Sequence, residues 1–79
     1  MTLEELSHDT FYNMENYSQL VIDLVYEVEG LYTYEEELNS FGALAYKVRN
    51  VIEVIDKSRE HDLKALKDLY RILNDELEK

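Results

Sequence analysis

The sequence predicts a small all-α protein, and three observations support this prediction. The 79 residues include no proline and only two glycines, so long helices meet few helix-breaking residues. Apolar side chains recur at spacings of three and four, the pattern of one helix face. No segment shows the strict apolar–polar alternation that is typical of a half-buried strand. We therefore expect one helical domain over residues 1–79.

The chain is expected to begin with a short helical turn. Thr2 and Glu5 form the T-x-x-E pattern of a capping box, in which each side chain accepts a hydrogen bond from the other residue's backbone N–H. This pattern predicts a helical turn over residues 3–6.

A first long helix is predicted over residues 9–29, with Ser7 or Asp9 as its N-cap. Gly30 is the expected C′ residue, because glycine adopts a positive φ without steric cost. One face of this helix carries a regular apolar stripe, which consists of Met14, Tyr17, Val21, Leu24, Val28 and Leu31.

A second long helix is predicted over residues 34–56. Thr33 and Glu36 form another T-x-x-E pattern, which would place three consecutive glutamates in the first helical turn, where the helix dipole favours negative charge. Gly42 lies in the interior of this helix and costs about 1 kcal/mol relative to alanine. Either the helix simply tolerates this cost, or Gly42 allows another helix to approach closely. The small neighbouring residues favour the close approach.

Seven consecutive polar residues, 56–62, separate this helix from a third one over residues 60–78. They favour a loop, with Ser58 or Asp62 as the next N-cap, and hence an antiparallel three-helix bundle preceded by the short turn. The alternative is one continuous helix through this run, which would require a partner chain to cover its faces. Because a chain of this length buries a small core, a homodimer that completes the core is attractive.

The charge is distributed unevenly along the chain. The net charge is −10, and residues 1–46 contain ten carboxylates but no Lys or Arg, whereas the remaining residues sum to zero. Such a chain repels phosphate, so we expect neither direct nucleic-acid binding nor docking on anionic membranes. No signal-peptide pattern and no apolar run of about 20 residues is present, so a cytoplasmic location is expected.

The residues required for catalysis or metal binding are scarce. There is no cysteine, and the adjacent residues Ser7, His8 and Asp9 cannot form a catalytic triad, whose members come from separate elements. Glu5 and His8 match one Glu-x-x-His pair, but a di-iron site needs two such pairs and further glutamates. We therefore expect no enzymatic activity, no cofactor and no metal.

Binding to another protein is the function that these features favour. Apolar side chains that the bundle does not need, together with tyrosines and carboxylates, form the candidate partner-binding set: Tyr12, Glu15, Ile22, Asp23, Tyr26, Glu27, Glu29, Tyr32, Tyr34, Glu35, Glu36 and Glu37. The first hypothesis is a small acidic inhibitor that mimics nucleic acid and occupies the basic surface of a partner protein. The alternative is a regulatory or assembly adaptor, antitoxin- or scaffold-like, that acts through an apolar helix face and homo-oligomerisation.

Overall fold

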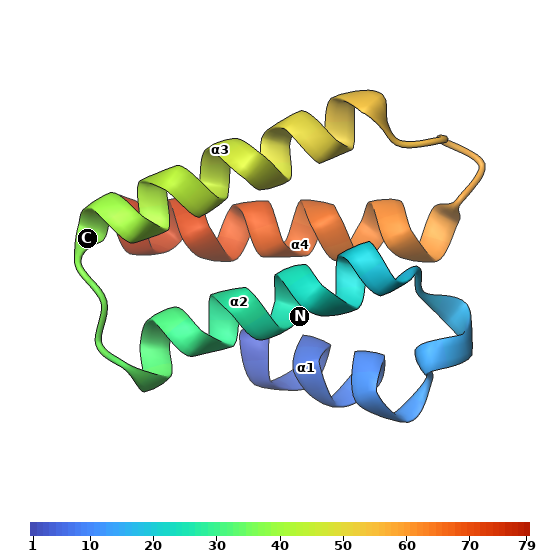
Figure 1. Cartoon of the computed structure of the whole chain (residues 1–79), viewed down its shortest axis with the longest axis horizontal. Coiled ribbons are helices and arrows are strands. Elements are labelled where there is room, and N and C mark those ends of the chain that lie inside the picture. The colour runs from blue at the N-terminus through green and yellow to red at the C-terminus, as the bar shows by residue number, and fades with distance from the viewer.

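The structure, a computed structural model that describes all 79 residues, contains only helices, which confirms the all-α class. Its elements are α1 (Leu3–Tyr12), the 3-10 turn η1 (Met14–Asn16), α2 (Gln19–Thr33), α3 (Leu38–Val54) and α4 (Glu60–Leu77). Consecutive α-helices run in opposite directions, with α1 beside α2 and α3 beside α4 (Figure 1). Four α-helices thus replace the three long helices and short turn that the sequence predicted.

The N-terminal capping box is present, but the helix that it opens is longer than predicted. The Thr2 hydroxyl accepts the N–H of Glu5, and the Glu5 carboxylate accepts the N–H of Thr2, both at 3.2 Å. The helix continues through the polar residues 7–9, which therefore do not begin a new helix. Leu6 and Thr10 are buried, so α1 is part of the packed molecule.

A corner between α1 and α2 interrupts the predicted helix 9–29. The Asp9 carboxylate accepts hydrogen bonds from the Asn13 side-chain amide at 2.8 Å and from the Tyr17 hydroxyl, and the Ser18 hydroxyl accepts the N–H of Val21. Asn and Ser side chains compete with helical hydrogen bonds in this way, which explains the break. Burial raises the pKa of Tyr17 to about 12, and the contact with Asp9 adds to this, so the hydroxyl keeps the proton that it donates.

The C-terminus of α2 differs from the prediction, because Gly30 lies inside the helix and is not its C′ residue. The C′ residue is Glu35 instead, with a φ of 51°. The N–H of Glu36 donates to the carbonyl of Leu31 at 2.9 Å, and the N–H of Glu35 donates to that of Tyr32 at 3.4 Å. These two bonds form a Schellman motif in which a glutamate occupies the left-handed position that glycine usually takes.

The helix predicted over residues 34–56 begins only at α3, so the second T-x-x-E pattern is not a capping box. Glu37 is the N-cap residue, and its side chain makes no capping hydrogen bond. The interpretation of Gly42 as a site of close helix approach is also wrong, because a Cβ atom there would meet nothing within 4 Å.

A loop separates α3 from α4, so the single continuous helix does not form. The Asp56 carboxylate accepts hydrogen bonds from both the N–H and the hydroxyl of Ser58, at 2.9 and 2.8 Å. Neither predicted N-cap residue serves as the cap, since Arg59 takes that position without a side-chain bond. Asp62 instead is buried, accepting the N–H of Ser18 at 2.9 Å and the Nε–H of Arg59 at 2.7 Å. It thereby ties the start of α4 to the start of α2.

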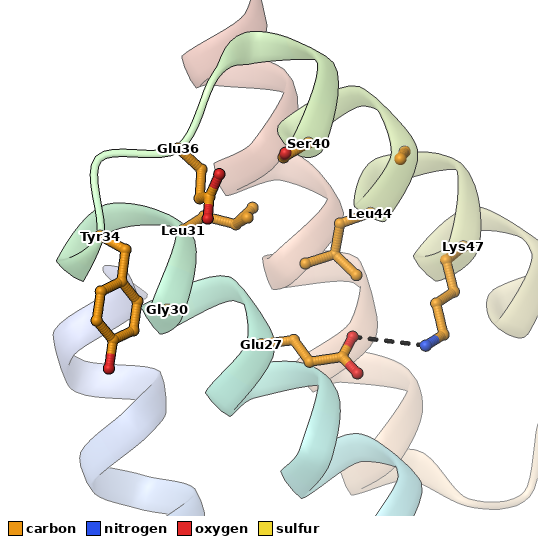
Figure 2. A pocket seen from close by; sticks show the side chains of 9 residues that line it. Glu27, Gly30, Leu31, Tyr34, Glu36, Ser40, Leu44 and Lys47 are labelled. Carbon is orange, nitrogen blue, oxygen red and sulfur yellow. Dashed lines mark hydrogen bonds and ion pairs between the residues drawn. The ribbon is translucent and has the colours of Figure 1, made fainter.

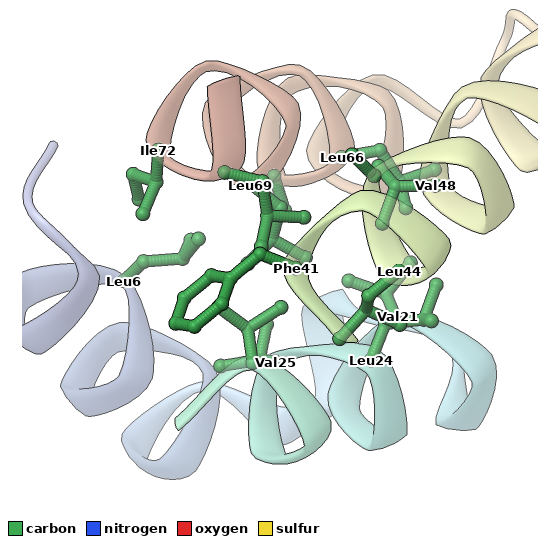
Figure 3. Close-up of a cluster of buried hydrophobic side chains, with 14 residues drawn as sticks. Leu6, Val21, Leu24, Val25, Phe41, Leu44, Val48, Leu66, Leu69 and Ile72 are labelled. Atoms are coloured by element: carbon green, nitrogen blue, oxygen red, sulfur yellow. The ribbon is translucent and has the colours of Figure 1, made fainter. Parts of the chain in front are cut away.

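The core lies where all four α-helices meet (Figure 3). It consists of fourteen buried apolar residues: Leu6, Val21, Leu24, Val25, Val28, Phe41, Leu44, Ala45, Val48, Ala65, Leu66, Leu69, Ile72 and Leu73. The packing of α3 is most extensive against α4 and much less extensive against α2. α2 therefore lies less closely against α3 than α4 does.

Candidate protein-binding surface

The turn between α2 and α3, residues 34–37, is acidic and exposed, and we call it the acidic turn. Tyr34 is 78% exposed, and the three glutamates that follow it are exposed as well. None of these glutamates forms an ion pair with another residue. Because Glu35 and Glu36 precede α3 rather than lie in its first turn, the helix dipole no longer accounts for their presence there.

A groove of about 470 Å³ lies between α2 and α3, directly beside the acidic turn (Figure 2). It is lined by Glu27, Gly30, Leu31, Tyr34, Glu36, Ser40, Ala43, Leu44 and Lys47. The lining residues follow i, i+3, i+4, i+7 spacing on both sides. They are residues 27, 30 and 31 of α2 with its C-cap Tyr34 on one side, and residues 40, 43, 44 and 47 of α3 on the other. The groove, which we call the α2–α3 groove, is thus built from one regular face of each helix.

The α2–α3 groove is open because small residues occupy both faces. A Cβ atom on Gly30 would meet nothing within 4 Å, so the space beside it is empty. Ser40 and Ala43 on the opposite face also have short side chains. Leu31 and Leu44 are left as the apolar floor, with Leu44 only 8% exposed.

Charged groups flank this apolar floor. Figure 2 shows Glu36 over Leu31 near the acidic turn, while Glu27 and Lys47 face each other farther along the groove. The Glu27 carboxylate lies 3.5 Å from the Lys47 ammonium, and both side chains are about half exposed, at 48% and 53%. An exposed pair of this kind contributes about 0–1 kcal/mol, so the carboxylate can readily exchange its partner.

A second exposed surface lies between α1 and α2 and is aromatic. Phe11 and Tyr12 pack edge to face with ring centroids 5.4 Å apart, and His8 lies 4.3 Å from Tyr12. Tyr26 from α2 lines the same shallow cavity, and all three of these larger aromatic side chains are exposed. We call Phe11, Tyr12 and Tyr26 the aromatic patch.

The predicted partner-binding residues do not form one surface. Glu27, Tyr34 and the three glutamates lie at the groove and the acidic turn, whereas Tyr12, Tyr26 and Glu29 line the cavity between α1 and α2. Asp23 accepts a hydrogen bond from Gln19 at 2.8 Å, and Glu15 is exposed in η1. Tyr32 packs edge to face against Phe41, with its hydroxyl 3.5 Å from Glu76.

Ile22 is the clear error in the predicted set, because it is buried, with 3% of its surface exposed. In the predicted three-helix bundle, the helix that contains Ile22 has only two neighbouring helices. In the structure α1 packs against α2, and Tyr26, which lies one turn after Ile22 on the same face, lines the cavity between these two helices.

Several groove residues were not predicted from the sequence, chiefly Ser40, Ala43, Leu44 and Lys47. A signal was present, since Gly30, Ser40 and Ala43 place small residues on regular helix faces. The spacing between α2 and α3, which decides whether small residues leave a groove or allow close contact, cannot be read from one sequence.

Neither the remaining structural features nor the comparison with other proteins points to a particular function. No three His, Asp or Glu side chains converge in a way that could hold a metal ion. None of the helices combines the length and apolar character needed to cross a membrane. No protein-family model matches the chain, and no curated protein or solved structure shows significant similarity to it.

Proposed function

We propose that the protein is a non-enzymatic binding module that occupies a basic, nucleic-acid-binding surface of a partner protein. One observation supports this proposal most strongly. The acidic turn presents three consecutive exposed carboxylates, none of which forms an ion pair with a cation of the chain, and the N-cap residue Glu37 makes no side-chain capping hydrogen bond.

The charge of the whole molecule supports the same proposal. With a net charge of −10, the protein attracts basic partners over a distance of about one Debye length and repels nucleic acid itself. Closely spaced carboxylates can take the places that phosphates occupy in a Lys- and Arg-lined groove. Tyr34, exposed beside them, offers a large contact area at low cost in side-chain entropy.

The test is affinity capture with two matched variants that each lose two charges. Glu36→Gln with Glu37→Gln neutralises the acidic turn, and Glu53→Gln with Glu60→Gln neutralises exposed carboxylates on α3 and α4. We expect a basic protein to be retained by the wild type and by the second variant but not by the first. DNA or RNA should release it, because both ligands compete for one surface.

Two results would contradict this function. One is a captured partner that nucleic acid does not displace. The other is equal retention by both variants, which would show that the position of the carboxylates has no influence on binding.

A second candidate function, an assembly adaptor, is favoured by the aromatic patch. Phe11, Tyr12 and Tyr26 are 59%, 66% and 42% exposed and lie together, as contact residues in protein interfaces do. This function requires self-association, which light scattering at two concentrations measures. A 9.4 kDa species at both concentrations would exclude a homodimer, and a dimer that Phe11→Ser dissociates would support it.

A further inference from the structure

We infer that the α2–α3 groove receives an amphipathic helix of the basic partner, with one large apolar side chain on the groove floor and Lys or Arg residues beside Glu27 and Glu36. This inference rests on the proposed function and specifies the partner's chemistry. It differs from pure nucleic-acid mimicry, which requires positive charge on the partner but no apolar anchor.

The size and lining of the groove fit an apolar anchor. A volume of about 470 Å³ falls within the range of about 300–1,000 Å³ that is usual for ligand pockets. Leu31 and Leu44 form the floor, and no side chain of the protein fills the space beside Gly30. An apolar side chain inserted there loses contact with water and gains contact with both leucines.

The shape of the groove favours a helical occupant. Its two walls are antiparallel helices that each present a regular i, i+3, i+4, i+7 face, and a third helix can place its own ridge of side chains between two such faces. Binding of an amphipathic helix in a groove of this kind is a common mode of peptide recognition.

The charges around the groove determine the sign of the charge that the occupant's polar face must carry. Carboxylates lie at both ends of the apolar floor, Glu36 in the acidic turn and Glu27 farther along (Figure 2). Lys47 is the one cation among the lining residues, and it pairs with Glu27. It therefore occupies the place that a partner cation would take and competes with the partner for this carboxylate.

Gly30 and Gly42 provide a matched pair of variants for a direct test. Both glycines lie in helix interiors with open space where a Cβ would be, but only Gly30 lines the groove. Gly30→Leu therefore fills the groove, while Gly42→Leu makes the same chemical change outside it. Circular dichroism melting curves should be recorded first to check that both variants fold.

The probes are two fluorescein-labelled helical peptides of Lys, Ala and Leu that carry the same charge. One has a single central Leu, and the other has Ser at that position. Anisotropy titrations at low salt should show the Leu peptide binding wild type and Gly42→Leu about tenfold or more tighter than the Ser peptide. For Gly30→Leu the two peptides should bind equally.

A second pair of variants tests the competing cation. Lys47→Gln and Lys67→Gln each remove one exposed positive charge, but only Lys47 lines the groove. We expect Lys47→Gln to strengthen binding of the Leu peptide by about two- to fivefold and Lys67→Gln to change it less.

The outcomes separate this inference from the proposed function. If both basic peptides bind wild type equally and Gly30→Leu changes nothing, the groove inference is wrong, while binding to basic partners stands. If neither peptide binds, the groove inference and the proposed function both fail.

Discussion

Glu35 shows how a single residue can carry a cost that the fold does not require. It occupies the left-handed C′ position of the Schellman motif with a φ of 51°, where a side chain costs about 1 kcal/mol or more relative to glycine. Residues held in such conformations are found disproportionately at functional sites. The placement of a glutamate there agrees with the proposed role of the acidic turn.

Replacing Glu35 with glycine should therefore stabilise the protein while weakening the binding of a basic partner. We expect a gain of about 1 kcal/mol in the free energy of unfolding, because glycine adopts a positive φ without strain, and a Tm higher by about 4–8 °C. Thermal melting followed by circular dichroism measures the change. Glu36→Gly is the control, and an equal gain in that variant would show that strain at Glu35 is not the cause.

Asp62 is the residue at which acidity and stability are most directly linked. Burial raises the pKa of this carboxyl, but the hydrogen bonds from Ser18 and Arg59 lower it by more, so the net pKa lies below the usual value of 3.8. A carboxylate with a lowered pKa stabilises the folded state above about pH 4, and this contribution is lost as the pH falls through the folded-state pKa.

Asp62→Asn should lower the free energy of unfolding by about 1 kcal/mol or more at pH 7, since the amide has one acceptor oxygen where the carboxylate has two, so one of the two hydrogen bonds is lost together with the negative charge. The difference from wild type should shrink as the pH falls below 4, which urea denaturation at several pH values measures. Asp75→Asn, on an exposed carboxylate, serves as the control. A loss in the free energy of unfolding that does not change with pH would contradict the role assigned to Asp62.

At the scale of the helices, periodicity predicted the class of the fold and most of the apolar faces, but it misplaced several helix ends. The stripe from Val21 to Val28 is buried as expected, whereas Met14 and Tyr17 precede α2. Beside the local hydrogen bonds of Asn13 and Ser18, the break is held by the contact of Tyr17 with Asp9, eight residues away, and by that of Ser18 with Asp62, far along the chain. Neither kind of contact is visible in a spacing pattern.

Gly42 provides the test at this scale. Because a Cβ there meets nothing within 4 Å, Gly42→Ala should raise the free energy of unfolding by about 0.5–1 kcal/mol through the better helix propensity of alanine. Urea denaturation of the variant measures this gain. Loss of stability would instead indicate a close helix contact at this position.

At the scale of the whole molecule, the uneven distribution of negative charge along the sequence predicted only part of the candidate site. The predicted set contained all four residues of the acidic turn, although it placed them in a helix, and it grouped Tyr12 and Tyr26 of the aromatic patch with Glu27 of the groove. The separation arises because α1 folds back onto α2, which gives α2 one face toward α1 and another toward the groove. Only the three-dimensional arrangement of the helices could show this.

The central claim is that the acidic turn binds a basic partner through charge, and the salt dependence of the affinity tests it most directly. The affinity for the captured partner should be measured between about 0.05 and 0.2 M salt for wild type and for the variant Glu36→Gln with Glu37→Gln. We expect the wild-type affinity to fall by about tenfold or more and that of the variant to change less. An affinity that stays constant for the wild type over this range would contradict the claim.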